Sequence, residues 1–180
     1  MGDLDRIRLS TTKESPTDIL VTWAGWPMLM HSVRTAVAAV ASLLVARVFR
    51  LPETYWSVIS TLVITQSSVG AALKVSGQRF VGTLLGAIVG GIAASYFGSE
   101  TAIFAITVLI LGLLCALTRS DRSAYRFGGI TLVIVMLVPR TGPAWRIAFD
   151  RFTETSIGIG VALLLTVLWP DTEVPSGGKT

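Results

Sequence analysis

Polar side chains interrupt one of the apolar stretches of this sequence, over residues 55–73. Three of them, Thr61, Thr65 and Gln66, follow a tryptophan at Trp56. If the stretch crosses a lipid bilayer, each buried polar group needs a partner, so the helix should face protein or water. Serine and threonine can bond back to their own helix, but the Gln66 amide has both donors and acceptors to satisfy. These residues are therefore candidates to contact a polar ligand.

Charged side chains at the starts of other apolar stretches form a second group of candidates. Arg34 and Arg79 each stand near such a start. A guanidinium can hold a carboxylate through two parallel hydrogen bonds, and it can also simply extend to the membrane surface. Glu154 lies inside the last apolar stretch, three residues after Arg151. An intramembrane carboxylate is a candidate for proton movement, and a local pair with Arg151 is an equally good interpretation.

Other kinds of chemistry find no support in the sequence. One histidine, His31, and one cysteine, Cys115, cannot build a metal cluster of familiar spacing. The full glycine-rich phosphate motif, G-x-x-x-x-G-K followed by Ser or Thr, is absent. We therefore expect no enzyme activity, no metal and no cofactor. Lysine and arginine (15) outnumber aspartate and glutamate (11), which in a membrane protein reflects basic helix ends, so nucleic acid is not an expected partner.

Six apolar stretches must position these side chains. Hydrophobic residues make up 52% of the chain and charged residues 14%, with a mean hydropathy of +0.68. A transmembrane helix needs about 20 apolar residues. The expected spans are residues 31–49, 55–73, 80–97, 101–117, 125–138 and 152–169. The predicted fold class is all-α, a multi-pass membrane protein of six transmembrane helices.

The segments around these spans predict the domain organisation and orientation. Residues 1–30 should form a cytoplasmic N-terminal segment with an interfacial helix, 31–170 the six-helix membrane domain, and 171–180 a disordered tail. Segments on the N-terminal side of the membrane would hold ten lysines and arginines, against five on the other side. Both termini are therefore predicted to be cytoplasmic, in the inner or plasma membrane.

An internal repeat relates the two halves of the chain. Tyr55–Ile64 and Tyr125–Ile134 are identical at five of ten positions, and the pattern Arg-Phe-x-x-Thr-x-x-Gly starts at both Arg79 and Arg151. Three spans in each half would place the second half upside down in the membrane, a plan with a site near the midplane. Chance recurrence of Leu, Val and Ile is the alternative.

Glycines mark one face of the expected third span. Gly82, Gly86 and Gly90 are four residues apart and so lie on the same side of a helix. Bare faces of this kind let helix backbones approach closely. We expect these glycines to serve helix packing, either within the bundle or at a dimer contact.

Two segments resemble a known family. Residues 52–66, Pro-Glu-Thr-Tyr-Trp-Ser-Val-Ile-Ser-Thr-Leu-Val-Ile-Thr-Gln, resemble the Tyr-Trp segment of fusaric acid resistance–like (FUSC) membrane proteins. These belong to the aromatic acid exporter superfamily, with relatives among plant malate channels. Residues 79–87, Arg-Phe-Val-Gly-Thr-Leu-Leu-Gly-Ala, are similar to the family's R-x-x-GT-x-x-GA signature. Arg34-Thr35-Ala36 and Asp150-Arg151-Phe152 fit as well.

The resemblance implies a six-helix domain that transports small organic anions, such as aromatic carboxylates, and we expect export. The candidate substrate-binding residues are Gln66, Thr65, Thr61, Trp56, Arg79 and Arg34. Glu154 is the candidate for proton coupling. Larger family members join two such domains or add a cytoplasmic domain, so a homodimer in the lipid bilayer is expected for this chain. A non-transporting membrane scaffold, or a partner subunit of a larger assembly, is the alternative.

Overall fold

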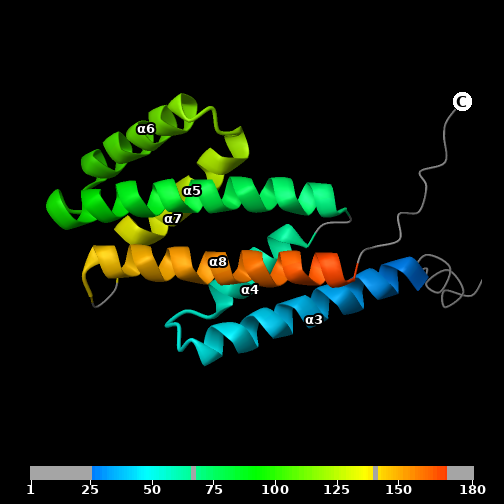
Figure 1. The fold of residues 1–180 in the computed structure, drawn as a ribbon. Helices are drawn as coiled ribbons and strands as arrows, with labels where there is room; N and C mark the ends of the chain where they lie inside the picture. Colours follow the sequence, from blue (N-terminus) through cyan, green and yellow to red (C-terminus); the bar gives the residue numbers. More distant parts are fainter. Residues whose placement is uncertain (1–25, 66–67, 140–141, 170–180) are drawn as a thin grey trace, which may run out of the picture. The chain divides into compact units, whose positions relative to one another are not determined.

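The chain is helical in a computed structural model that describes residues 26–65, 68–139 and 142–169 (Figure 1). Over these ranges the helices are α3 (Trp26–Val48), α4 (Tyr55–Ile64), α5 (Val69–Tyr96), α6 (Thr101–Leu117), α7 (Arg122–Leu137) and α8 (Ala144–Leu168). No strand forms in the same ranges. The expected all-α class is confirmed.

The chain divides into two compact units, Met1–Arg34 and Thr35–Thr180. The division falls within α3, so Arg34 belongs to the first unit and the remainder of that helix to the second. Most of the expected N-terminal segment, and all of the expected C-terminal tail, lie outside the described residues. The second unit contains the helices α4 to α8, and their packing positions the polar side chains.

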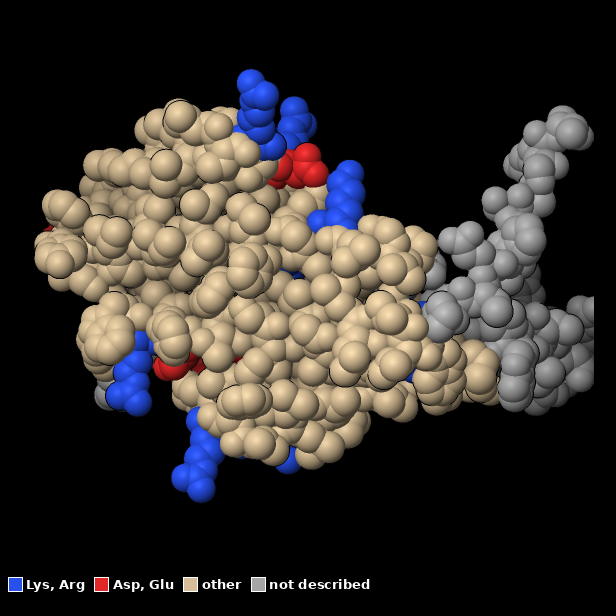
Figure 2. Space-filling view, viewed as in Figure 1, with Lys and Arg blue, Asp and Glu red and all other residues tan. Residues whose placement is uncertain are grey.

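Three helices, α3, α5 and α8, are long and apolar enough to cross a membrane. Helices α4 and α6 are apolar but shorter, and α6 has the bounds expected from the sequence. Large apolar side chains on α6 point outward, among them Ile106, Leu109 and Leu113. Figure 2 shows a visible face with few charges, which gather near the α3–α4 and α6–α7 connections. A broad apolar exterior is typical of a surface covered by lipid.

The expected second span, 55–73, is wrong in its extent. Helix α4 ends at Ile64, after 10 residues, and α5 begins at Val69, well before the expected start of the third span. The polar run that was expected to interrupt a single span instead ends one helix and starts another. Ser68 caps α5, since its side chain accepts a hydrogen bond from the Ala71 amide, and serine is among the preferred residues for that position.

The expected start of the last span, at residue 152, is also wrong. Helix α8 starts at Ala144, directly after Pro143, which is its N-cap. The Pro143 carbonyl accepts a hydrogen bond from the Ile147 amide (3.4 Å), and the amide that proline lacks would have no partner within the helix. The charged residues Arg146 and Asp150 therefore belong to the first turns of α8. Their polarity reflects the open cleft that they line.

Close crossings between long and short helices hold the second unit together. Helix α5 packs along α7 and α8, and α8 also packs against α4. A Cβ atom at Gly86 would lie 2.2 Å from the carbonyl oxygen of Gly128 on α7. A Cβ at Gly158 would lie 2.3 Å from the carbonyl oxygen of Ser57 on α4. Glycine is needed at both crossings because any side chain would meet backbone atoms.

Helices α3 and α6 end in the same way. Arg50, with φ of 53°, follows α3, and Arg119, with φ of 51°, follows α6. After Arg50 the Leu51 amide donates to the Ala46 carbonyl (3.2 Å), and an equivalent bond of 3.0 Å follows Arg119. Each is a Schellman motif that satisfies the last carbonyls of its helix, with arginine in the left-handed position that glycine usually takes.

Candidate anion-binding site

Arg79 on α5 is a buried guanidinium, 7% exposed. Its Nε and Nη2 atoms donate to the Ser60 hydroxyl of α4, at 3.2 and 3.1 Å. Its guanidinium carbon lies 4.9 Å from the ring centroid of Phe127 on α7, within the range of a cation–π interaction. In the described part of the chain, no carboxylate lies within ion-pair distance of Arg79.

Arg151 on α8 has the same kind of aromatic contact but different electrostatics. Its guanidinium carbon lies 4.6 Å from the ring centroid of Trp56 on α4. Its Nη2 atom pairs with Glu53 Oε2 at 2.8 Å and with Glu154. The Glu154 side chain is fully buried and also accepts a hydrogen bond from the Glu53 amide (3.0 Å). One buried cation is thus matched by two carboxylates.

The carboxylate of Glu53 accepts hydrogen bonds from three side chains of the described ranges. Besides Arg151, its Oε2 atom accepts from Trp56 Nε1 (2.9 Å) and from the Tyr55 hydroxyl (2.7 Å). The residue lies in the α3–α4 connection, and its side chain keeps 21% of its surface exposed. It therefore stands between solvent and the buried arginine.

A small inner pocket separates the two arginines. Its lining residues are Trp56, Arg79, Thr83, Phe127, Ile130, Thr131, Ile134, Arg151 and Thr155. The space that it leaves is about 20 Å³, roughly enough for one water molecule. Two arginines, three threonines and two aromatic residues thus line one small space, a composition suited to an anion with an aromatic body.

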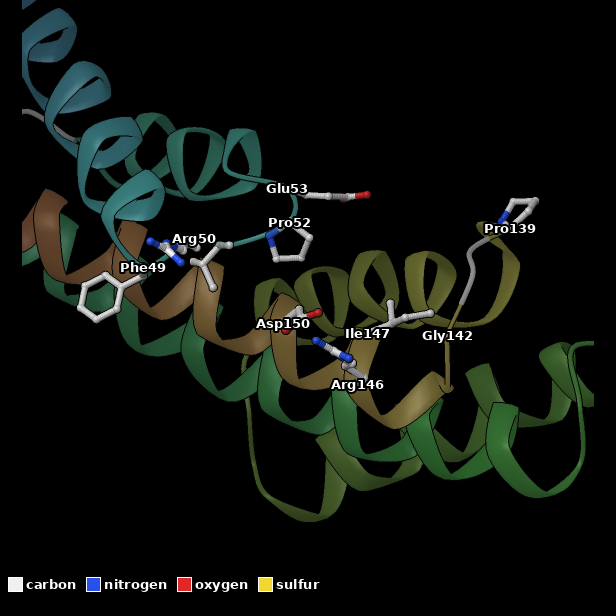
Figure 3. Close-up of a pocket in the computed structure, with 10 residues that line it drawn as sticks. Phe49, Arg50, Pro52, Glu53, Pro139, Gly142, Arg146, Ile147 and Asp150 are labelled. Carbon is white, nitrogen blue, oxygen red and sulfur yellow. The ribbon is translucent and has the colours of Figure 1, made fainter.

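An open cleft of about 1000 Å³ lies on the Glu53 side of this pocket. Figure 3 shows the α3–α4 connection, with Pro52 and Glu53, across the cleft from Ile147 and Asp150 of α8. Arg50 and Arg146 also line it. Since Glu53 lines the cleft and also binds Trp56 and Arg151 of the inner pocket, its side chain marks the boundary between the two spaces.

The structure brings some of the sequence-predicted site residues together and places others elsewhere. Trp56 and Arg79 line the inner pocket. Thr61 and Thr65 do not; the Thr61 hydroxyl donates to the Gly158 carbonyl (3.1 Å) and the Thr65 hydroxyl to the Thr61 carbonyl (2.8 Å). These two hydroxyls join helices or stay within one.

The remaining predicted residues are not among those that line the inner pocket, or they fall outside the described ranges. Gln66 falls outside the described residues. Arg34 belongs to the unit Met1–Arg34 and is 1% exposed. Glu154 does not line the pocket, but it pairs with Arg151, which does.

The predicted packing glycines lie where α5 meets α7. A Cβ at Gly82 would lie 2.1 Å from the Ala124 carbonyl oxygen, and one at Gly90 would lie 3.4 Å from Leu132 Cα. Gly86, between them, makes the close crossing with Gly128. In the described chain, this glycine face is therefore turned toward α7 within the bundle.

Sequence reasoning missed several members of the site. Glu53, Ser60 and Phe127 carried no recognised signal, because their roles depend on contacts between distant segments; Glu53 and Arg151 are 98 positions apart. Arg151 did carry a signal, since it starts the same Arg-Phe-x-x-Thr-x-x-Gly pattern as Arg79. The repeat could have identified Arg151 as a second candidate site residue, equivalent to Arg79.

Comparison with known proteins adds independent information. The family described as fusaric acid resistance protein-like matches residues 23–165. "Uncharacterized transporter YdhK" of Escherichia coli strain K12 is 28% identical over 158 residues, which cover 83% of this chain and 23% of that protein. "Inner membrane protein YeeA" of the same strain is 29% identical over 146 residues, 79% of this chain and 41% of that protein.

A mycobacterial protein extends these similarities. "Putative arylamide transporter" of Mycobacterium bovis is 25% identical over 148 residues, 79% of this chain and 40% of that protein. The chain thus spans less than half the length of each of these relatives. No solved structure matches the chain.

Proposed function

Because this chain belongs to the fusaric acid resistance protein-like family, we propose that it is a membrane transport domain that exports small organic anions, aromatic carboxylates among them. The observation that carries the proposal is Arg79. It is a buried cation that, among the described residues, binds a hydroxyl and an aromatic ring but no carboxylate.

The environment of Arg79 matches the chemistry of such a substrate. A buried charge without an opposite charge is destabilising, so a carboxylate that enters the inner pocket gains an interaction with Arg79 that no carboxylate of the described ranges makes. The guanidinium can bind it with paired hydrogen bonds. Phe127 and Trp56 offer faces and edges to an aromatic ring, and Thr83, Thr131 and Thr155 offer hydroxyls.

Transport requires a second conformation of this site. The inner pocket, at about 20 Å³, is too small for an aromatic acid, whereas the cleft beside Glu53 is open. The structure therefore fits a state in which the anion has access to the cleft only. In the cycle that we propose, α4 or α7 separates from α5 and α8, and the site then opens to the other side.

We also propose six crossings built as an inverted repeat of three helices each, with both termini in the cytoplasm. Three features support the repeat. Helices α3 and α6 are each followed by an arginine with positive φ, and α4 packs on α8 as α7 packs on α5. In addition, Phe80 and Phe152, which occupy the same position of the shared pattern, meet at 5.1 Å between ring centroids. A residue that touches its own counterpart lies near a two-fold axis.

A homodimer is the proposed working unit, because the resemblance implies that larger family members join two such domains. Arg34 and Gln66 remain candidate contacts to the anion in that assembly. If the chain instead serves as a scaffold or partner subunit, the purified protein will carry no flux.

The proposal can be tested with the purified full chain in liposomes. Efflux of radiolabelled benzoate is measured for the wild type and for Arg79→Gln. We expect the substitution to lower efflux at least about tenfold, since a hydrogen bond to a charged group contributes about 1.5–3 kcal/mol. Arg79→Lys, which keeps the charge but loses the paired geometry, should fall in between.

Lys74→Gln is the matched control. Lys74 lies on the same helix, and its side chain is 73% exposed, so its removal changes the net charge equally without touching the pocket. Its efflux should equal that of the wild type. Wild-type efflux no faster than leakage from empty liposomes would overturn the transport proposal and favour the scaffold.

A further inference from the structure

We propose that the Glu53 carboxylate is a tethered anion that occupies a second carboxylate subsite, formed by Arg151 and the indole N–H of Trp56, until a substrate carboxylate replaces it. The inference rests on the proposed function and deepens it. It assigns a substrate subsite to Arg151 and makes Glu53 the side chain that must leave before an anion passes from the cleft to the inner pocket.

The geometry of the bound carboxylate supports this assignment. Glu53 Oε2 lies 2.8 Å from a guanidinium nitrogen and 2.9 Å from the indole nitrogen. Both donors belong to residues that line the inner pocket, whereas Glu53 itself lines the open cleft. A carboxylate entering from the cleft thus meets these donors first and finds them already in use by a chemically identical group.

Exchange of one carboxylate for another preserves the local charge balance. With Glu53 in place, Arg151 faces two carboxylates, one of them the fully buried Glu154. If Glu53 left without a replacement, Arg151 would keep Glu154 but lose its second carboxylate and the indole would lose its acceptor. If a substrate carboxylate enters as Glu53 leaves, the charge and the donors remain matched. The displaced side chain, already 21% exposed, turns into the water of the cleft.

The backbone of Glu53 provides a pivot for this movement. Its amide donates to Glu154 Oε1 at 3.0 Å, and that bond does not involve the side chain that leaves. Glu53 also precedes α4 in the α3–α4 connection, so its side chain can turn without breaking helical hydrogen bonds. The hydrogen bond from the Glu53 amide to Glu154 therefore keeps the α3–α4 connection on α8 while the Glu53 carboxylate turns outward.

The affinity of the detergent-solubilised full chain for radiolabelled benzoate tests the inference. Glu53→Gln removes the competing charge but keeps the side-chain size, so benzoate should bind about 5- to 150-fold more tightly, the usual range of coupling between two ligands. Asp150→Asn is the matched control, because Asp150 lines the same cleft, whereas the ion pairs described for Arg151 are with Glu53 and Glu154. It should change the affinity less than about twofold.

Two additional measurements test whether the gain depends on the charge of the ligand and on the hydrogen bonds that hold Glu53. Benzamide, the neutral counterpart, should bind the wild type and Glu53→Gln equally. Tyr55→Phe, at an exposed ring, removes one donor that holds Glu53 and should raise benzoate affinity by a smaller factor, about two- to fivefold. This variant also tests the inference if Glu53→Gln does not fold.

The outcomes distinguish this inference from the transport proposal. Arg79-dependent benzoate binding that is unchanged or weakened by Glu53→Gln and Tyr55→Phe would overturn the tethered anion and leave the transport proposal standing. Equal gains from Glu53→Gln and Asp150→Asn would also overturn it. No benzoate binding to the wild type or to Glu53→Gln would overturn both.

Discussion

Arg79 and Arg151 occupy the same position in the two halves of the sequence, yet their surroundings differ in charge. Each guanidinium lies over an aromatic ring of a shorter helix, Phe127 or Trp56. Arg151 is paired with two carboxylates, and Arg79 has no such partner among the described residues. The fold thus builds two similar cation sites and neutralises one of them.

The alignment of the halves shows how this difference arises. When Tyr55 is placed on Tyr125, Glu53 falls on Ser123; when Arg79 is placed on Arg151, Glu154 falls on Gly82. Both carboxylates near Arg151 therefore have small, uncharged counterparts on the Arg79 side. We infer that Arg151 is stabilised mainly by the protein itself, whereas Arg79 is left to interact with what the protein binds.

The largest expected effect compares loss of the two arginines. Arg151→Gln leaves the buried Glu154 without its cation, and breaking a buried ion pair in this way costs about 3–5 kcal/mol of stability. Arg79→Gln removes a buried cation that has no ion-pair partner among the described residues, so its stability should stay within about 1 kcal/mol of the wild type. Denaturation of the purified proteins in detergent, followed by fluorescence, measures both.

The double variant Arg151→Gln/Glu154→Gln sharpens this comparison. It removes both charges of the pair and should recover much of the stability lost in Arg151→Gln alone. Similar losses for the two single arginine variants would mean that the two arginine sites are electrostatically alike, which would contradict the difference inferred between them.

A second comparison concerns the two close helix crossings. Gly86→Leu and Gly158→Leu should each destabilise the protein by about 3 kcal/mol or more, because the new side chains meet backbone atoms that cannot turn away. The yield of folded protein in size-exclusion chromatography measures the effect. Gly160→Leu is the control, since nothing lies within 4 Å of a Cβ at that position. A normal yield of Gly86→Leu would contradict the close crossing.

The smallest expected change in stability comes from Glu154→Gln. The amide can still accept the hydrogen bond from the Glu53 backbone, and Arg151 retains Glu53 as an ion-pair partner. If Glu154 carries the coupling proton, benzoate flux through Glu154→Gln in liposomes should no longer respond to an imposed proton gradient. Benzoate flux without a proton gradient should continue. Flux that follows the gradient as in the wild type would exclude Glu154 from that role.

Residue type and hydrophobic periodicity predicted much of the helical plan. Helix α6 has its expected bounds because an uninterrupted apolar run ends at polar residues on both sides. The α4–α5 break was missed, because Thr65 to Ser68 are compatible with either a polar helix face or a helix end. The early start of α8 was missed because its first charged residues resemble a loop.

The candidate site was predictable only in part, for a physical reason. Arg79 stood out because a guanidinium at the start of an apolar stretch can hold a carboxylate through two hydrogen bonds. Glu53 did not, since a carboxylate between two spans is ordinary until folding brings α8 beside it. Whether a buried charge has an ion-pair partner depends on contacts between distant segments, and these contacts cannot be read from a single sequence.

The length of α4 has an electrical consequence for the proposed transport. Its 10 residues extend about 15 Å, half of a hydrocarbon layer of about 30 Å. Where water of the cleft reaches Glu53, the insulating layer beside α4 is correspondingly thin, and the membrane voltage drops over a short distance there. A carboxylate that crosses this barrier moves net charge through much of the field, so its export should create a current that depends on voltage.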